Sequence, residues 1–250
     1  MPMDEAPSTK KTAIVTGGSG GIGSGICRRL AKDGFNVVVH YHSDSEGAAG
    51  LVESLCEVGG RAVAVQADVT DQQQMSKLFE EAESRFGPVD VVVANAGISI
   101  GGPVADCSLD DFQKLISVNL LGAFLTIREA ARRVRDGGRI IFISSQLAER
   151  PRPGMGVYSA TKAAIDAMLV SMSHELGPRG LTVNSVRPGA TVPGVFDESG
   201  EDRQEVFRQL SVFKRLGTPD DVAGVVSFLA SHDADWITGQ HIRADGGMSN

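Results

Sequence analysis

Tyr158 and Lys162 are the pair of side chains in this sequence best suited to acid–base chemistry. They stand four residues apart in a stretch with helical periodicity, so they share one face of the expected helix. A phenol ordinarily has a pKa of about 10, and a nearby ammonium lowers that pKa by favouring the phenolate. Tyr158 is therefore a candidate to exchange a proton with a substrate oxygen. An ordinary exposed helix face shows the same spacing, so the pair alone does not decide.

Ser145 and Asn119 add polar groups at informative places. Ser145 comes just after the apolar run at residues 139–143, and its hydroxyl can bond a substrate oxygen and steady developing charge. Ser144 competes for that role. Asn119 interrupts a helical pattern although asparagine is a poor helix former. The residues themselves leave open whether Asn119 marks a helix kink or a functional group.

Five glycines crowd one turn near the start of the chain, at Gly17, Gly18, Gly20, Gly21 and Gly23. The turn lies between an expected strand and an expected helix. Glycines let a backbone approach a pyrophosphate, and a helix N-terminus offers free N–H groups and a positive dipole. This context predicts a dinucleotide site, with an ordinary tight turn as the alternative.

These groups must be positioned by strands that alternate with helices. Continuous apolar runs, which are typical of strands covered on both faces, occupy residues 13–15, 37–39, 62–65, 89–93, 139–143, 181–186 and 241–242. Helical patterns occupy residues 22–32, 46–58, 74–86, 109–134, 155–176 and 220–230. The order predicts an α/β fold, with one doubly wound Rossmann-type domain and a parallel sheet over residues 11–250. Residues 1–10 are expected to form a flexible end.

Residues 190–216 are the least regular part of the chain and contain the acidic run 197–202. Such an excursion beyond a strand end is either a lid over a substrate or a solvated helical insertion. We expect the substrate pocket to be formed by this lid together with residues 99–106 and 146–157. Arg150 and Arg152 lie in the last of these segments, where they either attract an anionic substrate or face water.

The composition narrows the range of partners. The chain has 31 acidic and 24 basic residues, a net charge of −7 and no basic block, which argues against a nucleic-acid partner. The three cysteines are far apart, which favours a reducing, cytoplasmic location over a disulfide framework. No cluster has metal-ligand spacing, and no apolar run is long enough to cross a membrane. We therefore expect neither a metal nor a membrane partner.

Together these motifs resemble those of the short-chain dehydrogenase/reductase family. Thr16-Gly17-x-x-x-Gly21-x-Gly23 matches the cofactor turn of that family. Further matches, in the family's order, are Asp68-Val69, Asn95-Ala96-Gly97, Asn119, Ser145, Tyr158-x-x-x-Lys162, Arg187-Pro188-Gly189 and Asp245-Gly246-Gly247. The resemblance covers nearly the whole chain, and the subgroup that it most looks like is the 3-oxoacyl-acyl-carrier-protein-reductase-like one.

The resemblance implies a catalytic tetrad of Asn119, Ser145, Tyr158 and Lys162. The family's spacing selects Ser145 over Ser144, and Asn119 would help to hold a water that links Lys162 to solvent. The implied reaction on a small-molecule substrate is the reduction of a ketone or 3-oxoacyl carbonyl to an alcohol, or the reverse, by hydride transfer with Tyr158 as the acid/base. The alternatives are an NAD-dependent alcohol or sugar dehydrogenase of the same family and a non-catalytic nucleotide-sensing protein.

The resemblance also assigns residues to the cofactor. These residues are Gly17, Ser19, Gly21, Ile22, Gly23, Tyr41, His42, Ser43, Asp68, Val69, Asn95, Ala96, Gly97, Tyr158, Lys162, Pro188, Gly189 and Thr191. Asp68 would bond the adenine amino group or close a turn, whereas Asn95 would serve the cofactor, the central sheet or both. Pro193 departs from the family, which usually has a threonine there, so either Thr191 is the substitute contact with the nicotinamide carboxamide or that contact is missing.

The end of the second strand favours NADP(H) over NAD(H). A carboxylate at this point holds the ribose hydroxyls of NAD and repels a 2′-phosphate, and Tyr41 stands where NAD-using relatives carry that acid. Ser43 and the next helix N-terminus are candidates to receive the phosphate. At least one of His40 and His42 is expected to be an exposed loop residue. Relatives are commonly tetramers, so we expect a homotetramer.

Overall fold

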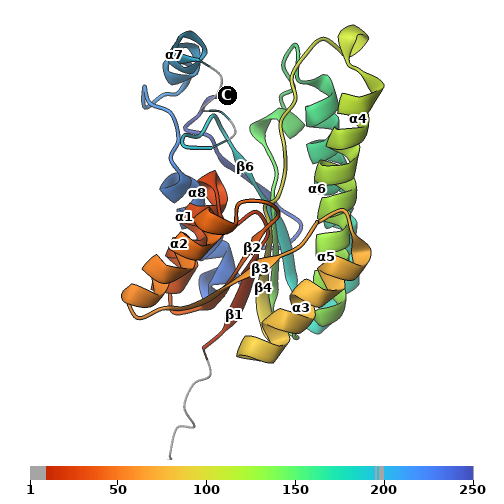
Figure 1. Ribbon diagram of the computed structural model, residues 1–250. Helices are drawn as coiled ribbons and strands as arrows, with labels where there is room; N and C mark the ends of the chain where they lie inside the picture. Colours follow the sequence, from red (N-terminus) through yellow and green to blue (C-terminus); the bar gives the residue numbers. More distant parts are fainter. Residues whose placement is uncertain (1–9, 195, 197–199, 250) are drawn as a thin grey trace, which may run out of the picture.

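Seven parallel strands form one continuous sheet in the computed structural model, which describes residues 10–194, 196 and 200–249. The strand order is β3-β2-β1-β4-β5-β6-β7 (Figure 1). The strands are β1 (Thr12–Val15), β2 (Asn36–Tyr41), β3 (Arg61–Gln66), β4 (Val89–Ala94), β5 (Arg139–Ile143), β6 (Thr182–Pro188) and β7 (His241–Ala244). Each predicted strand is confirmed within a few residues, as is the Rossmann-type α/β class.

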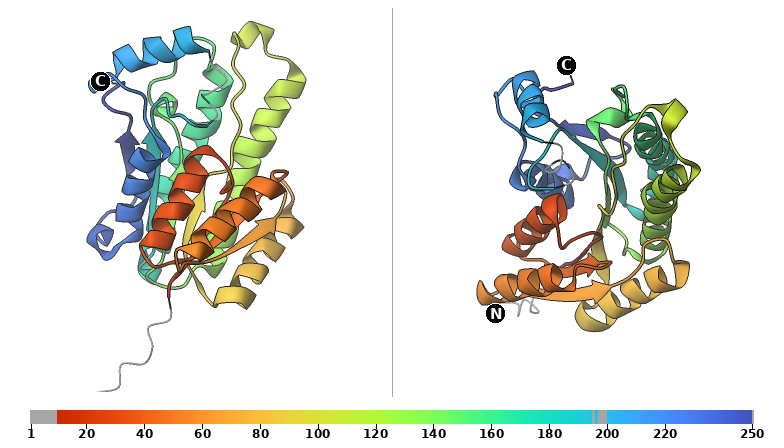
Figure 2. Two further views of the ribbon diagram at one scale, coloured as in Figure 1. Left: turned by 60° about the vertical axis from the view of Figure 1, so that its left-hand side comes forward. Right: turned by 45° about the horizontal axis from the view of Figure 1, so that its top comes forward.

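Helices cover both faces of this sheet (Figures 1 and 2). One face carries α1 (Gly21–Lys32), α2 (Ser45–Glu57) and α8 (Pro219–Ala230), and the other carries α3 (Gln72–Phe86), α5 (Ala123–Arg133) and α6 (Gly156–Leu176). Alternate strand residues divide between the two cores: Ala13 and Val15 pack toward α1, whereas Ile14 packs toward α3. Burial on both faces explains why the strands are continuously apolar.

The long helical pattern at residues 109–134 is interrupted in the structure. It comprises α4 (Leu109–Leu115), a π-helical segment (Ile116–Gly122) and α5. Asn119 lies in the middle of the π-helical segment. Wide π-helical turns are frequent at functional sites. A poor helix former, Asn119, therefore coincides with a departure of the backbone from the α-helix.

The described part of the excursion at residues 190–216 contains the α-helix α7 (Glu201–Leu210), whose bounds the sequence patterns did not give. None of its ten residues is buried. Residues 195 and 197–199, and with them half of the acidic run, lie outside the described residues, as do residues 1–9 of the expected flexible end. The presence of α7 agrees with a solvated helical insertion. The segment also lies beside the cleft at the carboxyl ends of the strands, which agrees with a substrate lid.

The described chain has three unpaired cysteines and no spanning helix. Cys27 is buried, Cys56 is exposed and Cys107 is intermediate. Burial raises the pKa of the Cys27 thiol to about 12, so this group is chemically inert at neutral pH. Within the described residues, no helix is long and apolar enough to cross a bilayer.

Candidate active site

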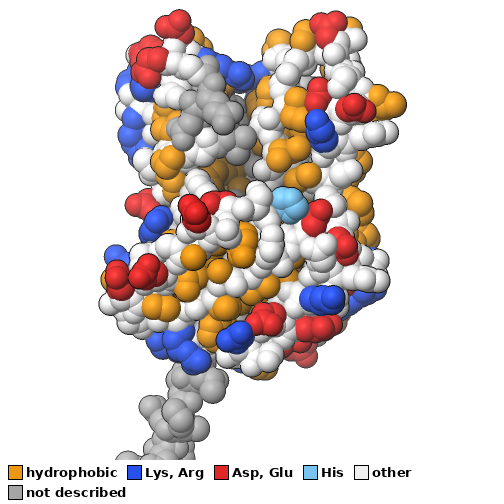
Figure 3. All heavy atoms as spheres, in the orientation of Figure 1, with side chains coloured by type: hydrophobic (Ala, Val, Ile, Leu, Met, Phe, Trp, Pro, Cys, Tyr) orange, Lys and Arg blue, Asp and Glu red, His pale blue; other side chains and the backbone are white. Residues whose placement is uncertain are grey.

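A cleft of about 1660 Å³ runs along the carboxyl ends of the strands. Figure 3 shows it as the hollow between the two upper lobes of the molecule. β1 lies between β2 and β4 in the sheet, so the chain turns to opposite sides there and opens a crevice. The volume exceeds the roughly 300–1,000 Å³ of a typical small-ligand pocket, which leaves room for a dinucleotide and a substrate.

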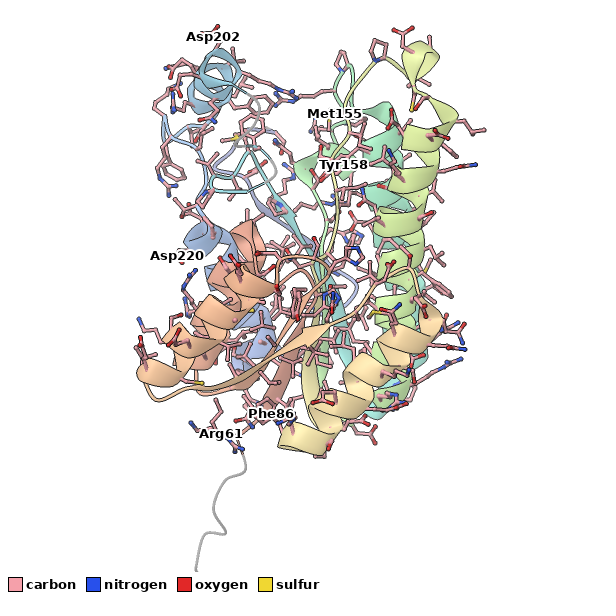
Figure 4. All side chains as sticks on the ribbon, viewed as in Figure 1. Arg61, Phe86, Met155, Tyr158, Asp202 and Asp220 are labelled. Atoms are coloured by element: carbon pink, nitrogen blue, oxygen red, sulfur yellow. The ribbon has the colours of Figure 1, made fainter. Side chains whose placement is uncertain are left out.

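Every residue that the sequence analysis assigned to the cofactor lines this cleft. So do Ser145, Tyr158 and Lys162. Asn119 is fully buried behind the cleft wall and does not line it. Tyr158 and Met155 lie on the α6 side of the cleft, and Asp202 marks α7 on the opposite side (Figure 4).

The glycine turn is packed too tightly to accept side chains. A Cβ on Gly23 would lie 2.0 Å from the Gly17 carbonyl oxygen, so only glycine fits there. Gly21 has φ of +44°, and a Cβ on it would approach the Gly194 Cα to 2.9 Å. The helix that follows also differs from its neighbours: Asp44, Asp71 and Thr218 cap α2, α3 and α8, whereas Gly20 brings no side chain to α1. The first N–H groups of α1 therefore donate no hydrogen bond to a side chain of the N-cap residue.

His40 holds this glycine turn from behind. Its Nδ1 accepts a hydrogen bond from Gly17 N at 3.0 Å, and its Nε2 donates to the Ala67 carbonyl at 2.9 Å. The two bonds require the neutral Nε2–H tautomer. Burial lowers the pKa of His40 to about 4, which keeps that form at neutral pH. His42 is exposed as expected, but His40 is a buried structural residue that the sequence analysis did not single out.

Asn95 and Asp68 both have structural partners while lining the cleft. The Asn95 Nδ2 donates to the carbonyls of Thr16 at 2.9 Å and Gly17 at 3.0 Å, and so ties β4 to the glycine turn. Asp68 Oδ1 accepts from Thr70 N and Thr70 Oγ1, each at 2.8 Å. The Thr70 N–H is the main reason that the pKa of Asp68 lies below its ordinary value. Asp68 therefore does close a turn.

Ser145 and Lys162 are buried, and Tyr158 is half-buried, where β5 meets α6. Burial raises the pKa of the Tyr158 phenol, and a hydrogen bond with Ser145 opposes that effect. Ser145 Oγ also accepts from Leu147 N at 3.1 Å. In this arrangement burial sets the direction of the phenol pKa, and the Lys162 ammonium, which points elsewhere, does not offset it.

The Lys162 ammonium points toward β5. Its Nζ donates to the Ile143 carbonyl at 2.8 Å and lies 6.0 Å from the centre of the Tyr158 ring. Burial lowers the pKa of Lys162 to about 8, although the nearby Asp166 carboxylate favours the charged form. This amine consequently titrates close to neutrality, where a small change in environment changes its charge.

Asn119 braces the strand–loop junction beside Lys162. Its Oδ1 accepts from Ile98 N and its Nδ2 donates to Ile98 O, both at 2.8 Å. A Cβ on Gly97 would lie 3.1 Å from Asn119 Oδ1 and 3.4 Å from Lys162 Nζ, so the two polar groups meet at that glycine. Asn119 is thus part of both the helix irregularity and the surroundings of Lys162.

Ser144 has a separate, structural set of contacts. Its N–H donates to the Val186 carbonyl at 2.8 Å, as expected for a strand-end partner, and its hydroxyl donates to Asp166 at 3.0 Å. Arg187 donates to the same Asp166 carboxylate at 2.8 Å. These bonds join the ends of β5 and β6 to α6 and hold the floor of the cleft.

The residues that line the outer half of the cleft include part of the expected substrate pocket. Residues from all three expected segments line it: Ser99, Gly101, Gly102, Gln146, Leu147, Arg152, Pro153, Gly154, Met155, Thr191, Gly194, Phe196, Arg203 and Phe207. One face of α4 and of the π-helical segment also lines the cleft. The sequence did not indicate this face, although its residues have helical spacing: Asp110, Gln113, Lys114 and Ser117. Thr191 lines the cleft and Pro193 does not, which fits the substitute contact expected of Thr191.

Comparisons with known proteins agree with this geometry. A sequence profile described as enoyl-(acyl carrier protein) reductase matches residues 17–249. An uncharacterized oxidoreductase of Methylorubrum extorquens is 42% identical over 241 residues, which are 95% of this chain and 97% of that protein. Versicolorin reductase of Emericella nidulans is 41% identical over 250 residues, with 95% of each chain covered. The structure of the angucycline C-6 ketoreductase LanV with bound NADP has a TM-score of 0.91 at 37% identity, covering 96% of this chain and 95% of that one.

The fold and the cleft define a dinucleotide-binding oxidoreductase, an NAD(P)-dependent enzyme that acts on CH–OH and C=O groups. The chain belongs to the short-chain dehydrogenase/reductase family, as its motifs predict. Within the described residues, no group of three or more His, Cys, Asp or Glu side chains is arranged to hold a metal ion.

Proposed function

We propose that this protein is an NADPH-dependent carbonyl reductase, also able to run the reverse oxidation, in which Tyr158 transfers the proton. The observation that carries the proposal is the hydrogen bond between the side chains of Tyr158 and Ser145, both of which line the dinucleotide-sized cleft. The reductase and ketoreductase names of the relatives support the same direction.

The residues present fit a dinucleotide. The pyrophosphate would lie against Gly21, Ile22 and Gly23, where the α1 N-terminus has no side-chain cap and the glycines keep the turn tightly packed. Pro188, Gly189 and Thr191 line the cleft on the far side of β5 and would border the nicotinamide. When bound, the reduced nicotinamide supplies the hydride.

The preference for NADP rests on the end of β2. Tyr41 stands where a ribose-binding carboxylate would exclude a 2′-phosphate, and Ser43 lines the cleft next to the α2 N-terminus. The carboxylate of Asp44 is engaged as the α2 cap, where it accepts from Gly47 N at 2.9 Å. The relative LanV was solved with bound NADP, which supports this choice.

Tyr158 is suited to donate a proton in the reductive direction. Its raised pKa keeps the phenol protonated at neutral pH, so a proton is available when the carbonyl oxygen gains charge. Ser145 would share that oxygen through its hydroxyl. The carbonyl carbon gains the hydride and the oxygen gains the phenolic proton, which together give the alcohol. Lys162 and Asn119 would then return a proton to Tyr158 from the solvent side.

Two further parts of the proposal concern movement and assembly. Residues 190–216 would close over the bound substrate, because Thr191, Phe196 and Phe207 line the cleft. The chain would assemble as a homotetramer. Light scattering that gives the mass of one chain would overturn the proposed assembly.

The test of the function is a screen of ketones and 3-oxoacyl thioesters followed by the loss of NADPH absorbance, with NADH alongside. We expect turnover of at least one carbonyl and a higher kcat/KM with NADPH. A higher kcat/KM with NADH would refute the NADP preference alone. Binding of NADPH without turnover of any carbonyl would refute the reductase function, and turnover by Tyr158→Phe at the wild-type rate would refute the role of Tyr158.

A further inference from the structure

We propose that Arg152 and Arg203 form an anion-recognition site at the outer end of the cleft. This site would select carbonyl substrates that carry a carboxylate or a similar anionic group on a flat apolar ring. The inference rests on the proposed reductase function and deepens it by naming a substrate class. It also resolves the alternatives left open for the arginines at positions 150 and 152.

Only one of those two arginines reaches the cleft. Arg152 is half-buried and lines the cleft, whereas Arg150 is exposed and does not line it. Arg152 lies on the loop that leads into α6, six residues before Tyr158, and so belongs to the wall that carries the phenol. Arg203 comes from α7 on the opposite wall (Figure 4, where its neighbour Asp202 is labelled).

Two phenylalanines bring these arginines to the same place. The Arg152 guanidinium carbon lies 4.8 Å from the centre of the Phe207 ring, and that of Arg203 lies 6.0 Å from the same centre. Arg203 also lies 5.7 Å from the Phe196 ring, which packs edge-on against Phe207 at 4.8 Å. A guanidinium stacked on a ring keeps its N–H edges free for hydrogen bonds. Both cations therefore present donors beside an apolar surface.

The charges of this pair are not neutralised by described carboxylates. Among the described residues, no carboxylate oxygen lies within 4.0 Å of the guanidinium nitrogens of Arg152 or Arg203. The Arg152 guanidinium donates one hydrogen bond, to the Met248 carbonyl at 3.4 Å. Nearby arginines differ: Arg208 on the same helix pairs with Glu201 and Glu205, and Arg187 pairs with Asp166. Two like charges that share one ring repel, and an anion between them would relieve that repulsion.

The remaining surroundings favour a ring as the carrier of the anion. Phe196 and Phe207 are half-buried and line the cleft, and Met155 faces it from the other wall. A flat apolar group can pack against such rings, while its acidic substituent takes the arginine donors in a bidentate manner. Figure 3 shows Lys and Arg side chains at the upper end of the hollow, although the net charge of the chain is −7.

The test compares two probes that differ only in charge, 4-acetylbenzoate and its methyl ester. We expect the wild-type enzyme to prefer the carboxylate at least ten-fold in kcat/KM. Arg152→Gln and Arg203→Gln should each lower that preference roughly ten-fold, mainly through KM, because each removes charge-assisted donors. The ester should be reduced equally by all variants. Arg150→Gln removes the same charge two residues away, outside the cleft, and should leave the preference unchanged.

A second measurement keeps the outcomes separate. Ligand-observed NMR in the presence of NADP would give the dissociation constant of 4-acetylbenzoate for each protein, whether or not the probe is turned over. Equal loss of preference in Arg150→Gln, or no weakening of carboxylate binding in the two cleft variants, would overturn the anion site. Reduction of the ester without preference for the acid would overturn it too while leaving the proposed reductase function intact.

Discussion

Replacing His40 by leucine removes the two hydrogen bonds that hold the glycine turn from behind. The Gly17 N–H and the Ala67 carbonyl would both lose their partner, because leucine fills the space but neither donates nor accepts. A polar group left unpaired on burial costs about 1–3 kcal/mol, so the two losses give roughly 2–6 kcal/mol. In a protein of this size, where each kcal/mol shifts Tm by about 2–4 °C, that corresponds to a fall in Tm of about 4–24 °C.

The pH dependence gives an independent magnitude. Burial lowers the pKa of His40 from 6.5 to about 4. Above pH 6.5 the imidazole is neutral in both states; between pH 6.5 and 4 the unfolded chain takes up a proton that the folded chain refuses. The free energy of unfolding therefore falls as the pH falls through this window, by about 3 kcal/mol at about 1.4 kcal/mol per pKa unit. His40→Leu should lack this part of the fall.

The assay is urea unfolding at several pH values between 7 and 4, with Tm measured alongside. Subtracting the variant from the wild type cancels the carboxylates that titrate in both proteins. His174→Leu is the matched control, since His174 is exposed on α6 and should change neither the Tm nor the pH slope appreciably. A His40→Leu protein with the wild-type Tm and the wild-type fall between pH 6.5 and 4 would refute the reasoning.

Four further predictions concern the cleft. Tyr158→Phe should lower kcat by about 10²–10⁴ and leave NADPH binding by fluorescence unchanged; near-normal turnover contradicts the mechanism. Ser43→Asp should raise the KM for NADPH at least ten-fold through repulsion of the 2′-phosphate and spare the KM for NADH, so an equal rise for both cofactors is the contrary result. Gly23→Ala should lower Tm and weaken NADPH binding because its Cβ would meet the Gly17 carbonyl, whereas the Cβ of Gly20→Ala meets no atom within 4 Å and should leave Tm unchanged in calorimetry. The rate of reduction should fall as the pH rises past about 8, where Lys162 loses its charge, and Lys162→Arg should move that fall to higher pH. Identical pH profiles of the two proteins in stopped-flow assays would speak against a role for the charge.

The strands and the candidate site could be predicted because their signals are local. Each parallel strand is buried on both faces and so reads as an apolar run, as in Val37-Val38-Val39. The glycine turn and the Tyr158–Lys162 spacing are likewise contained in a few consecutive residues. The carboxyl ends of parallel strands share one edge of the sheet, so side chains that follow β4 and β5 lie on the same side, and Asn95 and Ser145 both line the cleft.

What could not be predicted depends on distant partners. His40 looks like a loop residue in the sequence, but its two partners are 23 and 27 residues away. Arg150 and Arg152 are equivalent by type and spacing, and only the stacking on Phe207 separates them. The pKa of Tyr158 depends on its surroundings for the same reason: spacing places Lys162 on the same helix face, but the hydrogen bond to the Ile143 carbonyl turns the ammonium toward β5, and burial raises the pKa of the phenol.

The close approach of Gly194 to Gly21 makes the two ends of the cleft dependent on each other. The segment that touches the glycine turn continues through Phe196 into α7, whose Phe207 lines the outer end. A shift of Gly194 and Phe196 would therefore reach both the proposed nucleotide site and the proposed substrate site. If the bound nucleotide tightens substrate binding by some factor, the substrate must tighten nucleotide binding by the same factor, since the coupling free energy has no direction. Saturation curves for either ligand thus have meaning only at a stated concentration of the other.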